Sequence, residues 1–358
     1  MTALSSVNPL RGPFGVIAYP SMRKGLRASG RPTLADVAER AGVSAITASR
    51  ALRDPGKVSD RTRAEVERAV RALGYERDPA AAMLASGRSD AIGLVIPSVT
   101  NNVFADVLRG VYDGLEGTAH PVQIGNFRYS PLAEERLLAT FRSQRPAGLI
   151  VAGTDQSPAG RAALEGMGCP VVQIMDVCDD PVDMLVGIDH GAGAAMAARH
   201  LAERGYRRPG VLAARMDPRT RKRTAGFEGE ARGFEPARRV TTPEPSSVQL
   251  GARMLADLLT RAPDTDAVFC INDDLALGAL FEARRVGLEV PSRLGIAGFN
   301  DLEFAAAAEP GLTSVRTPRY EMGMRAASLL LDRLGGGPAA PAERLSCELR
   351  PRGSTARP

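Results

Sequence analysis

The sequence predicts an α headpiece followed by an α/β body: a helix-turn-helix unit with a linker that contains a short helix candidate, then a two-lobed, doubly wound parallel-sheet domain. Three observations lead to this prediction. Residues 31–75 contain three short amphipathic segments, and the chain from residue 91 onward alternates short apolar runs with amphipathic helices. The excess of basic charge lies in the first 90 residues. A chain of 358 residues is long enough for two or three domains.

The segment 33–53, TLADVAERAGVSAITASRALR, is predicted to form a helix, a tight turn at Gly42 and a second helix. Thr33 and Ser44 stand where N-caps are expected, and Asp36 follows Thr33 at the spacing of a capping box. Each helix has an apolar stripe for burial. The stripes are Leu34, Val37, Ala38 and Ala41 on the first helix, and Val43, Ala48, Ala51 and Leu52 on the second.

A third amphipathic segment follows, with Ser59 as its cap. Its stripe consists of Val66, Ala69, Val70 and Leu73. Three short helices of this kind form a helix-turn-helix module, whose second helix enters the major groove of DNA. An ordinary helical hairpin is the alternative interpretation of this pattern taken alone.

The charge distribution favours a polyanionic partner for the headpiece. Residues 1–90 contain 15 Lys and Arg against 9 Asp and Glu, a balance of +6, whereas the other residues contain 31 against 32, a balance of −1. A uniformly solvated basic surface would not be divided in this way.

Composition argues against several other classes of protein. Four cysteines without metal spacing and only three histidines predict no metal, no cofactor and free thiols in a reducing cytoplasm. No run suits a membrane span, and LRGPFGVIAYP is too short for an export signal. The chain has no GxSxG, P-loop or GxGxxG motif, so we predict no catalytic residue and no enzyme. Residues 1–30 are expected to be a disordered extension, or to include an overlong start before Met22.

Several longer motifs resemble the lactose-repressor (LacI) family of transcription regulators. They are TLADVAERAGVS, TASRAL, VSDRTR, LGY, and ML before GLVIP, and the resemblance runs from about Arg31 to the C-terminus. It implies a cytoplasmic, nucleoid-associated homodimer that binds double-stranded operator DNA and a small-molecule effector. GLVIPSVTNNVFADVLRGV, PVVQIMD and LAARMDPRTRKR look like the gluconate-operon repressors within this family. The effector expected from that likeness is a sugar acid such as gluconate or a phosphorylated relative.

The headpiece residues expected to touch DNA divide by chemistry. Ala45, Ile46 and Arg50 are predicted to face base edges, because arginine suits guanine and isoleucine suits the thymine methyl group. Phosphate contacts and the rest of the interface are assigned to Ser49, Arg53, Lys57, Arg61, Arg63, Thr33, Ser44 and Thr47.

Residues 76–90 are expected to link the headpiece to the body. They contain a short helix candidate, 79–86, with proline at its first turn. The resemblance makes this segment a hinge helix that folds on operator DNA, with Leu84 as the leucine inserted into the minor groove and Ala81 beside it. A plain solvated linker is the alternative.

The body, residues 91–358, is predicted to contain two lobes because about 260 residues exceed one sheet of modest size. Its strand candidates are AIGLVIP, PVQIG, GLIVAG, PVVQIM, MLVGID, PGVLAA, AVFCI and LGIAGF. The resemblance implies a periplasmic-binding-protein-like form. Its first lobe is about 91–188 plus 318–335, and its second is about 189–317 plus 340–350.

Polar residues that follow the strands mark the expected ligand cleft. Such residues are also good helix caps, so each one has a structural alternative. The resemblance narrows the set to Asn102, Phe104, Asp155, Arg223, Asn272 and Asn300. Arg215 also follows a strand, and with Arg223 it could bind a carboxylate bidentately. Four other charged or titratable residues near the expected cleft have a structural interpretation instead of a ligand-binding one. Arg219, Arg221 and Lys222 can be solvated surface residues, and His190 can be a helix-start or interlobe surface residue.

The sequence therefore predicts a DNA-binding regulator, most simply a repressor of sugar-acid catabolic genes that the effector releases from its operator. A regulator of another sugar and a corepressor-type regulator are the alternatives. A solute-binding protein would need an export signal and would lack the basic headpiece. Dimer contacts are expected along 103–115 and 276–286, and the C-terminus lacks the leucine heptads of a tetramerising coil.

Overall fold

The computed structural model describes residues 32–53, 55–76, 87–230, 233–338 and 342–357. They belong to two compact units divided after Asp78, which are described separately below as the headpiece and the body. The predicted N-terminal extension and the hinge residues Ala81 and Leu84 lie outside the described residues.

The headpiece contains the three predicted helices. They are α1 (Leu34–Ala41), α2 (Ala45–Arg53) and α3 (Asp60–Leu73), with a short 3-10 turn, η1 (Pro55–Lys57). α1 begins with a capping box, because the Thr33 hydroxyl accepts from the Asp36 N–H while the Asp36 carboxylate accepts from the Thr33 N–H. α1 ends at Gly42, which has a left-handed φ of 67°. Ser59 caps α3, as predicted.

The apolar stripes of the three helices meet in one small core. Its buried members are Val37, Ala38, Ala48, Ala51, Val66 and Ala69. Small alanines on α2 let this helix pack closely against its neighbours. The helix-turn-helix prediction is confirmed, and the opposite face of α2 is left exposed.

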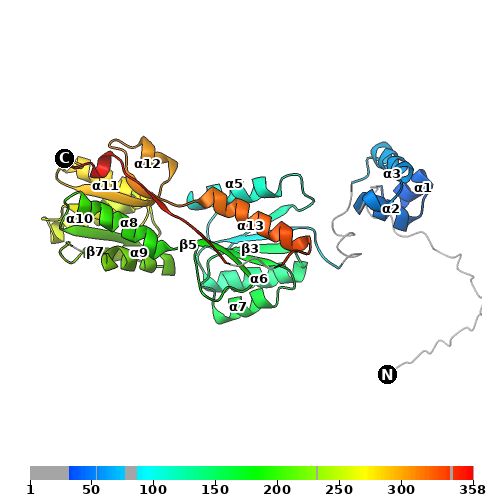
Figure 1. The fold of residues 1–358 in the computed structure, drawn as a ribbon, viewed down its shortest axis with the longest axis horizontal. Helices are drawn as coiled ribbons and strands as arrows, with labels where there is room; N and C mark the ends of the chain where they lie inside the picture. Colours follow the sequence, from blue (N-terminus) through cyan, green and yellow to red (C-terminus); the bar gives the residue numbers. More distant parts are fainter. Residues whose placement is uncertain (1–31, 54, 77–86, 231–232, 339–341, 358) are drawn as a thin grey trace, which may run out of the picture. The chain divides into compact units, whose positions relative to one another are not determined.

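The body contains two six-stranded sheets, one in each lobe (Figure 1). The first has the order β11-β5-β4-β3-β1-β2, and its paired strands are parallel. Its strands are β1 (Ile92–Ile96), β2 (Val122–Asn126), β3 (Gly148–Ala152), β4 (Val171–Ile174), β5 (Met184–Ile188) and β11 (Glu343–Leu345).

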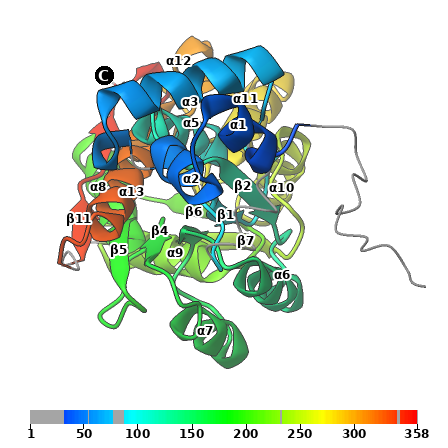
Figure 2. The same cartoon turned by 90° about the vertical axis from the view of Figure 1, so that its right-hand side faces the viewer.

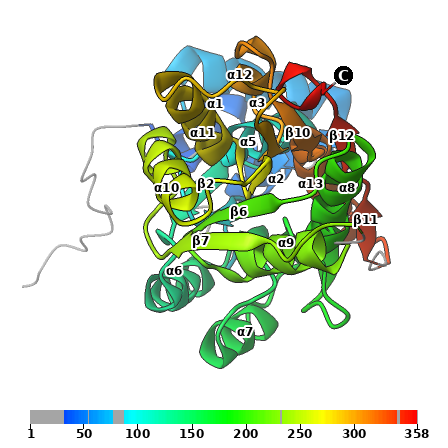
Figure 3. The same cartoon turned by 90° about the vertical axis from the view of Figure 1, so that its left-hand side faces the viewer.

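The second sheet has the order β12-β10-β9-β8-β6-β7. Figure 3 shows its neighbouring strands β6 and β7 side by side. Its strands are β6 (Pro209–Ala214), β7 (Arg238–Thr242), β8 (Ala267–Cys270), β9 (Gly295–Asn300), β10 (Thr313–Arg316) and β12 (Glu348–Arg350). β12 runs antiparallel to β10, and the other pairs are parallel.

Helices cover both faces of each sheet, as in a doubly wound fold. One face of the first sheet is covered by α5 (Val103–Leu115) and α13 (Arg319–Leu334). Its other face is covered by α6 (Pro131–Gln144) and α7 (Pro158–Glu165). Figure 2 shows α6 and α7 below the strands of the first sheet. One face of the second sheet is covered by α8 (His190–Glu203) and α9 (Pro218–Gly229). Its other face is covered by α10 (Val248–Arg261) and α11 (Asp273–Arg285). The short α12 (Glu303–Ala307) follows β9, and η2 (Gly353–Thr355) lies near the C-terminus. No helix among the described residues has both the length and the apolar character needed to cross a membrane.

Strand β1 illustrates why its sequence is apolar throughout. Leu94 and Ile96 belong to the core shared with α5 and α13, whereas Val95 belongs to a second core beneath α6 and α7. Gly93 faces α6, where a Cβ atom would lie 2.8 Å from the Phe141 ring. Continuous apolar runs of this kind are typical of parallel strands buried on both faces.

The third crossing between the lobes differs from our expectation. The chain passes from β5 to α8 and from β10 to α13 where predicted. We assigned residues 340–350 to the second lobe, but β11 pairs with β5 of the first sheet and only β12 pairs with β10 of the second. The crossing therefore falls at residues 346–347. Three-residue edge strands carry no apolar run that would reveal their sheet.

Strands β7 and β10 were not predicted. β7 is an edge strand in which only Val240 is buried. β10 is buried but polar: the Thr313 N–H donates to the Ser354 hydroxyl at 2.8 Å, and the Ser314 hydroxyl donates to the Asp273 carboxylate at 2.5 Å. Hydrophobic periodicity detects neither kind of strand.

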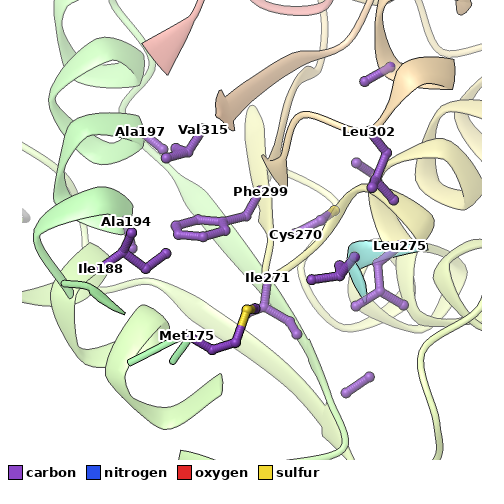
Figure 4. Close-up of a cluster of buried hydrophobic side chains, with 14 of the residues drawn as sticks. Met175, Ile188, Ala194, Ala197, Cys270, Ile271, Leu275, Phe299, Leu302 and Val315 are labelled. Atoms are coloured by element: carbon purple, nitrogen blue, oxygen red, sulfur yellow. The ribbon is translucent and has the colours of Figure 1, made fainter. Parts of the chain in front are cut away.

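One hydrophobic core continues from the first lobe into the second beside the crossings. Figure 4 shows part of it, with the Phe299 ring of β9 among side chains that include Ile188, Ala194 and Val315. Met175, which follows β4 in the first lobe, belongs to the same cluster. This shared core brings the carboxyl ends of both sheets to a common boundary.

Candidate functional site

The outer face of α2 presents the residues predicted to face base edges. Ala45, Ile46 and Arg50 are exposed, and Ile46 is 73% exposed. Ala48, on the opposite face, is fully buried in the headpiece core. The helix therefore offers an apolar group and a guanidinium together, which can meet a thymine methyl and a guanine edge.

The hydroxyl groups assigned to DNA also cap helices. The Ser44 hydroxyl accepts from the Thr47 N–H at 3.1 Å and lies 2.9 Å from the Thr47 hydroxyl. Thr33 is occupied in the capping box of α1. These residues stabilise the helix starts, and their contact with DNA stays a prediction.

The basic residues near α3 are held by weak surface pairs. Arg61 lies 3.1 Å from Glu65 and Arg63 lies 2.8 Å from Glu67, one helical turn away in each case. Exposed pairs of this type contribute little free energy, so both guanidinium groups can turn to phosphates. Ser49 is half-buried, Lys57 is exposed, and the side chain of Arg53 lies outside the described residues.

In the body, a cleft lies between the two lobes and contains about 490 Å³ of unfilled space, partly open to solvent. It brings together five of the predicted residues: Phe104, Arg215, Arg223, Asn272 and Asn300. It also contains residues that we did not predict: Asn101, Val103, Tyr129, Met175, Ala214, Asp217, Arg219, Thr220, Ser246 and Ile271. Phe104 is only 2% exposed, so it is part of the core and of the cleft wall at once.

Two predicted residues are not part of the cleft lining. Asn102 is exposed and makes no cap hydrogen bond. Its neighbour Asn101 lines the cleft instead, donating from Nδ2 to the Tyr129 hydroxyl at 3.1 Å and accepting from the Val103 N–H at 3.0 Å. Because α5 begins at Val103, the turn before it points Asn101 inward and Asn102 outward. Asp155 is exposed and outside the lining.

Arg223 is a buried cation whose direct partners are neutral. Its Nη1 donates to the Ile271 carbonyl at 2.7 Å, its Nη2 to Asn300 Oδ1 at 3.5 Å, and its Nε to His190 Nδ1 at 3.2 Å. The guanidinium carbon lies 3.9 Å above the Phe299 ring. Burial lowers the pKa of Arg223 to about 10, so the group is still charged at neutral pH.

Two further arginines make the cleft positive. Arg215 stacks on Tyr129 across the cleft, with its guanidinium carbon 3.7 Å from the ring centroid. Arg219 lies 3.9 Å from Asp217, the one carboxylate among the residues that line the described cleft. Three arginines against one aspartate leave the lining with an excess of positive charge.

The solvated-surface interpretation of the neighbouring cations is only partly right. α9 is a regular helix, and its Lys222 reaches the first lobe, where Nζ donates to both carboxylate oxygens of Asp176 at 2.7 and 2.8 Å. Asp176 is 1% exposed, so this is an interlobe ion pair. Arg221 does stay on the exposed side, bonded to the Met216 carbonyl.

His190 is at a helix start, as expected, but it is not a surface residue. It is fully buried, and its Nε2 lies 2.9 Å from the Met175 carbonyl oxygen. Burial, followed by the positive charge of Arg223, lowers its pKa well below the ordinary value of 6.5. No local pattern of residues indicated this contact, because Met175 and His190 meet only across the lobe boundary.

The two predicted asparagines of the cleft lining have different structural roles. Asn272 caps α11 by accepting from the Leu275 N–H at 3.3 Å and also accepts from the Ser246 hydroxyl at 2.8 Å. Asn300 ends β9, is 2% exposed and has a φ of 106°. Both interpretations offered by the sequence, capping and cleft lining, therefore apply to Asn272. Within the described residues, no group of three His, Cys, Asp or Glu side chains could hold a metal ion.

Comparison with known proteins assigns each unit a counterpart. Residues 33–78 match the family described as bacterial regulatory proteins, lacI family, and residues 198–355 match the periplasmic binding protein-like domain. The chain is 41% identical to the HTH-type transcriptional regulator GntR of Pseudomonas aeruginosa over 87% of its own length and 92% of the relative.

Solved structures show the same likeness. A LacI-family transcriptional regulator from Silicibacter pomeroyi is 37% identical with a TM-score of 0.81, covering 91% of this chain and all of the other. The lac repressor dimer bound to operator and the anti-inducer ONPF is 25% identical with a TM-score of 0.80, covering 91% and 99%.

Proposed function

The chain belongs to the lacI family of bacterial regulatory proteins and is a DNA-binding transcriptional regulator; on this premise we propose that it represses genes of sugar-acid catabolism. A sugar acid such as gluconate, or a phosphorylated relative, binds in the interlobe cleft and releases the protein from its operator. The protein acts in the cytoplasm, at the chromosome.

The environment of the Arg223 guanidinium is the observation that best supports an acidic effector. This guanidinium is charged, buried and in contact with neutral acceptors, so a ligand carboxylate would add a direct counter-charge to the favourable charge of nearby Asp217. Arg215 and Arg219 add to the positive potential at the same cleft. The likeness to regulators named GntR agrees with this choice of ligand class.

Asn300 favours an acid over a neutral sugar. Asn300 Oδ1 lies 3.5 Å from Arg223, where a carboxylate would neutralise the guanidinium and repel an anion. A neutral amide at this position leaves the charge of Arg223 available. We therefore assign the ligand carboxylate to the region between Arg223, Asn300 and Arg215.

The headpiece would read operator DNA through α2, with Ile46 and Arg50 at base edges. The lac repressor structure, which contains a dimer on its operator, supports a homodimer here as well. The segments predicted to join two copies carry large exposed side chains, Tyr112 at 49% and Phe281 at 52%. Two headpieces in such a dimer would read a pseudo-palindromic site.

Operator binding with and without ligand tests the proposal. Fluorescence anisotropy with a duplex from the upstream region of the gene should show tight binding at modest salt that about 1 mM gluconate weakens at least tenfold. Glucose at the same concentration should have little effect. Ile46→Ala should lose preference for the specific duplex, while Arg63→Ala should weaken all duplexes alike.

Release by neutral sugars alone would contradict the acidic effector, and tighter operator binding with gluconate would show a corepressor instead. A full-length protein that does not distinguish its upstream duplex from random DNA would contradict the assigned reading helix.

A further inference from the structure

His190 connects the two lobes through a single imidazole ring. Its Nε2 faces the carbonyl oxygen of Met175 in the first lobe at 2.9 Å, and its Nδ1 faces the Nε of Arg223 in the second lobe at 3.2 Å. Both ends of the ring are therefore used, and the side chain is completely buried.

The two partners determine the protonation state of the ring. An arginine Nε can only donate, so Nδ1 of His190 must accept and carries no proton. A carbonyl oxygen can only accept, so Nε2 must carry the proton that it donates to Met175. The neutral Nε2–H tautomer satisfies both contacts, whereas a doubly protonated ring would place one N–H against another. Burial and the positive charges of Arg223, Arg219 and Lys222 lower the pKa of His190, which also favours the neutral form.

The contact on the first lobe leads directly to its packed helices. The Met175 N–H lies 3.2 Å from the sulfur of Met322 in α13. α13 lies against α5 so closely that a Cβ atom on Gly110 would be 2.1 Å from the Tyr320 carbonyl oxygen. A shift of the Met175 backbone would therefore act on two helices that are packed closely together.

We propose that His190 is a positioning residue that makes the orientation of the Arg223 guanidinium depend on how the lobes are arranged. In the lobe arrangement of this structure, the ring holds Arg223 ready for an anion. When the lobes separate, the ring loses one of its two partners. Ligand binding and lobe arrangement are thereby coupled. This inference rests on the proposed function, since it concerns the same cleft.

Two substitutions separate the two contacts. His190→Asn keeps an acceptor oxygen near the position of Nδ1 for Arg223 but is too short to reach the Met175 carbonyl. His190→Phe keeps the ring that packs against Phe299, with centroids 6.0 Å apart, and removes both hydrogen bonds. We expect His190→Asn to bind gluconate with an affinity within about threefold of that of the unmodified protein. Its operator release at saturating gluconate should be reduced at least fivefold. His190→Phe should also weaken gluconate binding, by about tenfold.

His200 provides a matched control on the same helix. It is also buried, with a lowered pKa, but its Nε2 bonds to the Thr355 hydroxyl at 2.7 Å within the second lobe. His200→Asn should lower stability as His190→Asn does, yet leave operator release unchanged. An equal loss of release in both variants would overturn the inference, because a merely structural role would then explain it.

Hydrogen exchange of the full-length protein gives a measurement that needs no effector. His190→Asn should increase exchange in residues 171–177 and 319–324, whereas His200→Asn should increase it in residues 311–316 and 353–356. Unchanged exchange in the first pair of segments, or unchanged operator release, would overturn the role of His190. Failure of the unmodified protein to respond to gluconate would instead contradict the proposed effector, and the exchange measurement would still decide the inference.

Discussion

Replacing Asn300 by aspartate should convert the cleft from one that selects an anion to one that disfavours it. The new carboxylate would stand about 3.5 Å from the Nη2 of Arg223, where the amide oxygen now lies. Two opposite unit charges at that distance attract each other by about 5 kcal/mol at an effective dielectric constant of ~20. The charge of Arg223 would be neutralised within the protein, so a ligand carboxylate would gain little from it.

The same substitution would also repel the ligand directly. A carboxylate bound ~6 Å from Asp at position 300 would be disfavoured by about 3 kcal/mol at the same dielectric constant, which corresponds to roughly a 100-fold weaker affinity. Neutral sugars carry no charge, so this electrostatic repulsion would not affect them. Asn300→Asp should therefore weaken gluconate by about two orders of magnitude and change glucose binding little.

Isothermal titration calorimetry at constant ionic strength measures this difference, and Asn102→Asp is the matched control. Asn102 is exposed and outside the cleft lining, so the same added charge there should change gluconate affinity by less than about twofold. A folded Asn300→Asp protein that binds gluconate as tightly as the unmodified chain would refute the assigned place of the ligand carboxylate.

Three further predictions concern stability, each measured by denaturant unfolding. Gly226→Ala should destabilise the protein by about 1–3 kcal/mol, because its Cβ would lie 2.2 Å from a backbone oxygen of α8. The control Gly229→Ala has open space around the new Cβ, so it should be neutral or slightly stabilising. Equal effects of the two substitutions would argue against this packing. Lys222→Met should cost about 1–3 kcal/mol by leaving the buried Asp176 carboxylate unpaired, and adding Asp176→Asn should restore most of that loss. Burial raises the pKa of Glu134 from 4.5 to about 7, so its contribution to stability is present at low pH and is lost as pH rises through about 7. Glu134→Gln should consequently stabilise the protein at pH 8 by about 1–3 kcal/mol more than at pH 5, and a gain independent of pH would contradict the shift.

The headpiece could be predicted from its sequence almost residue by residue. Capping signals, a helix-ending glycine and short apolar stripes are local, and each is read within one or two helical turns. The long apolar strands of the body were equally visible, because burial on both faces leaves a continuous run. Edge strands such as β7 and β11 were missed or misassigned, since only their partners make them strands.

The cleft was predicted in outline and corrected in detail. Arg215, Arg223, Asn272 and Asn300 follow strands or a family motif, and all four line it. The choice between Asn101 and Asn102 depends on where α5 begins, and a shift of one residue reverses which side chain points inward.

By itself, the sequence determined which segments become the headpiece helices and the apolar buried strands, because these features depend on residues close together along the chain. Only the tertiary structure decided which groups meet across the lobe boundary. His190 joins Met175 to Arg223, and Lys222 joins Asp176, through contacts that span 15 to 46 positions of sequence. Periodicity records which face a side chain occupies; it carries no information about the neighbour that the fold places opposite that face.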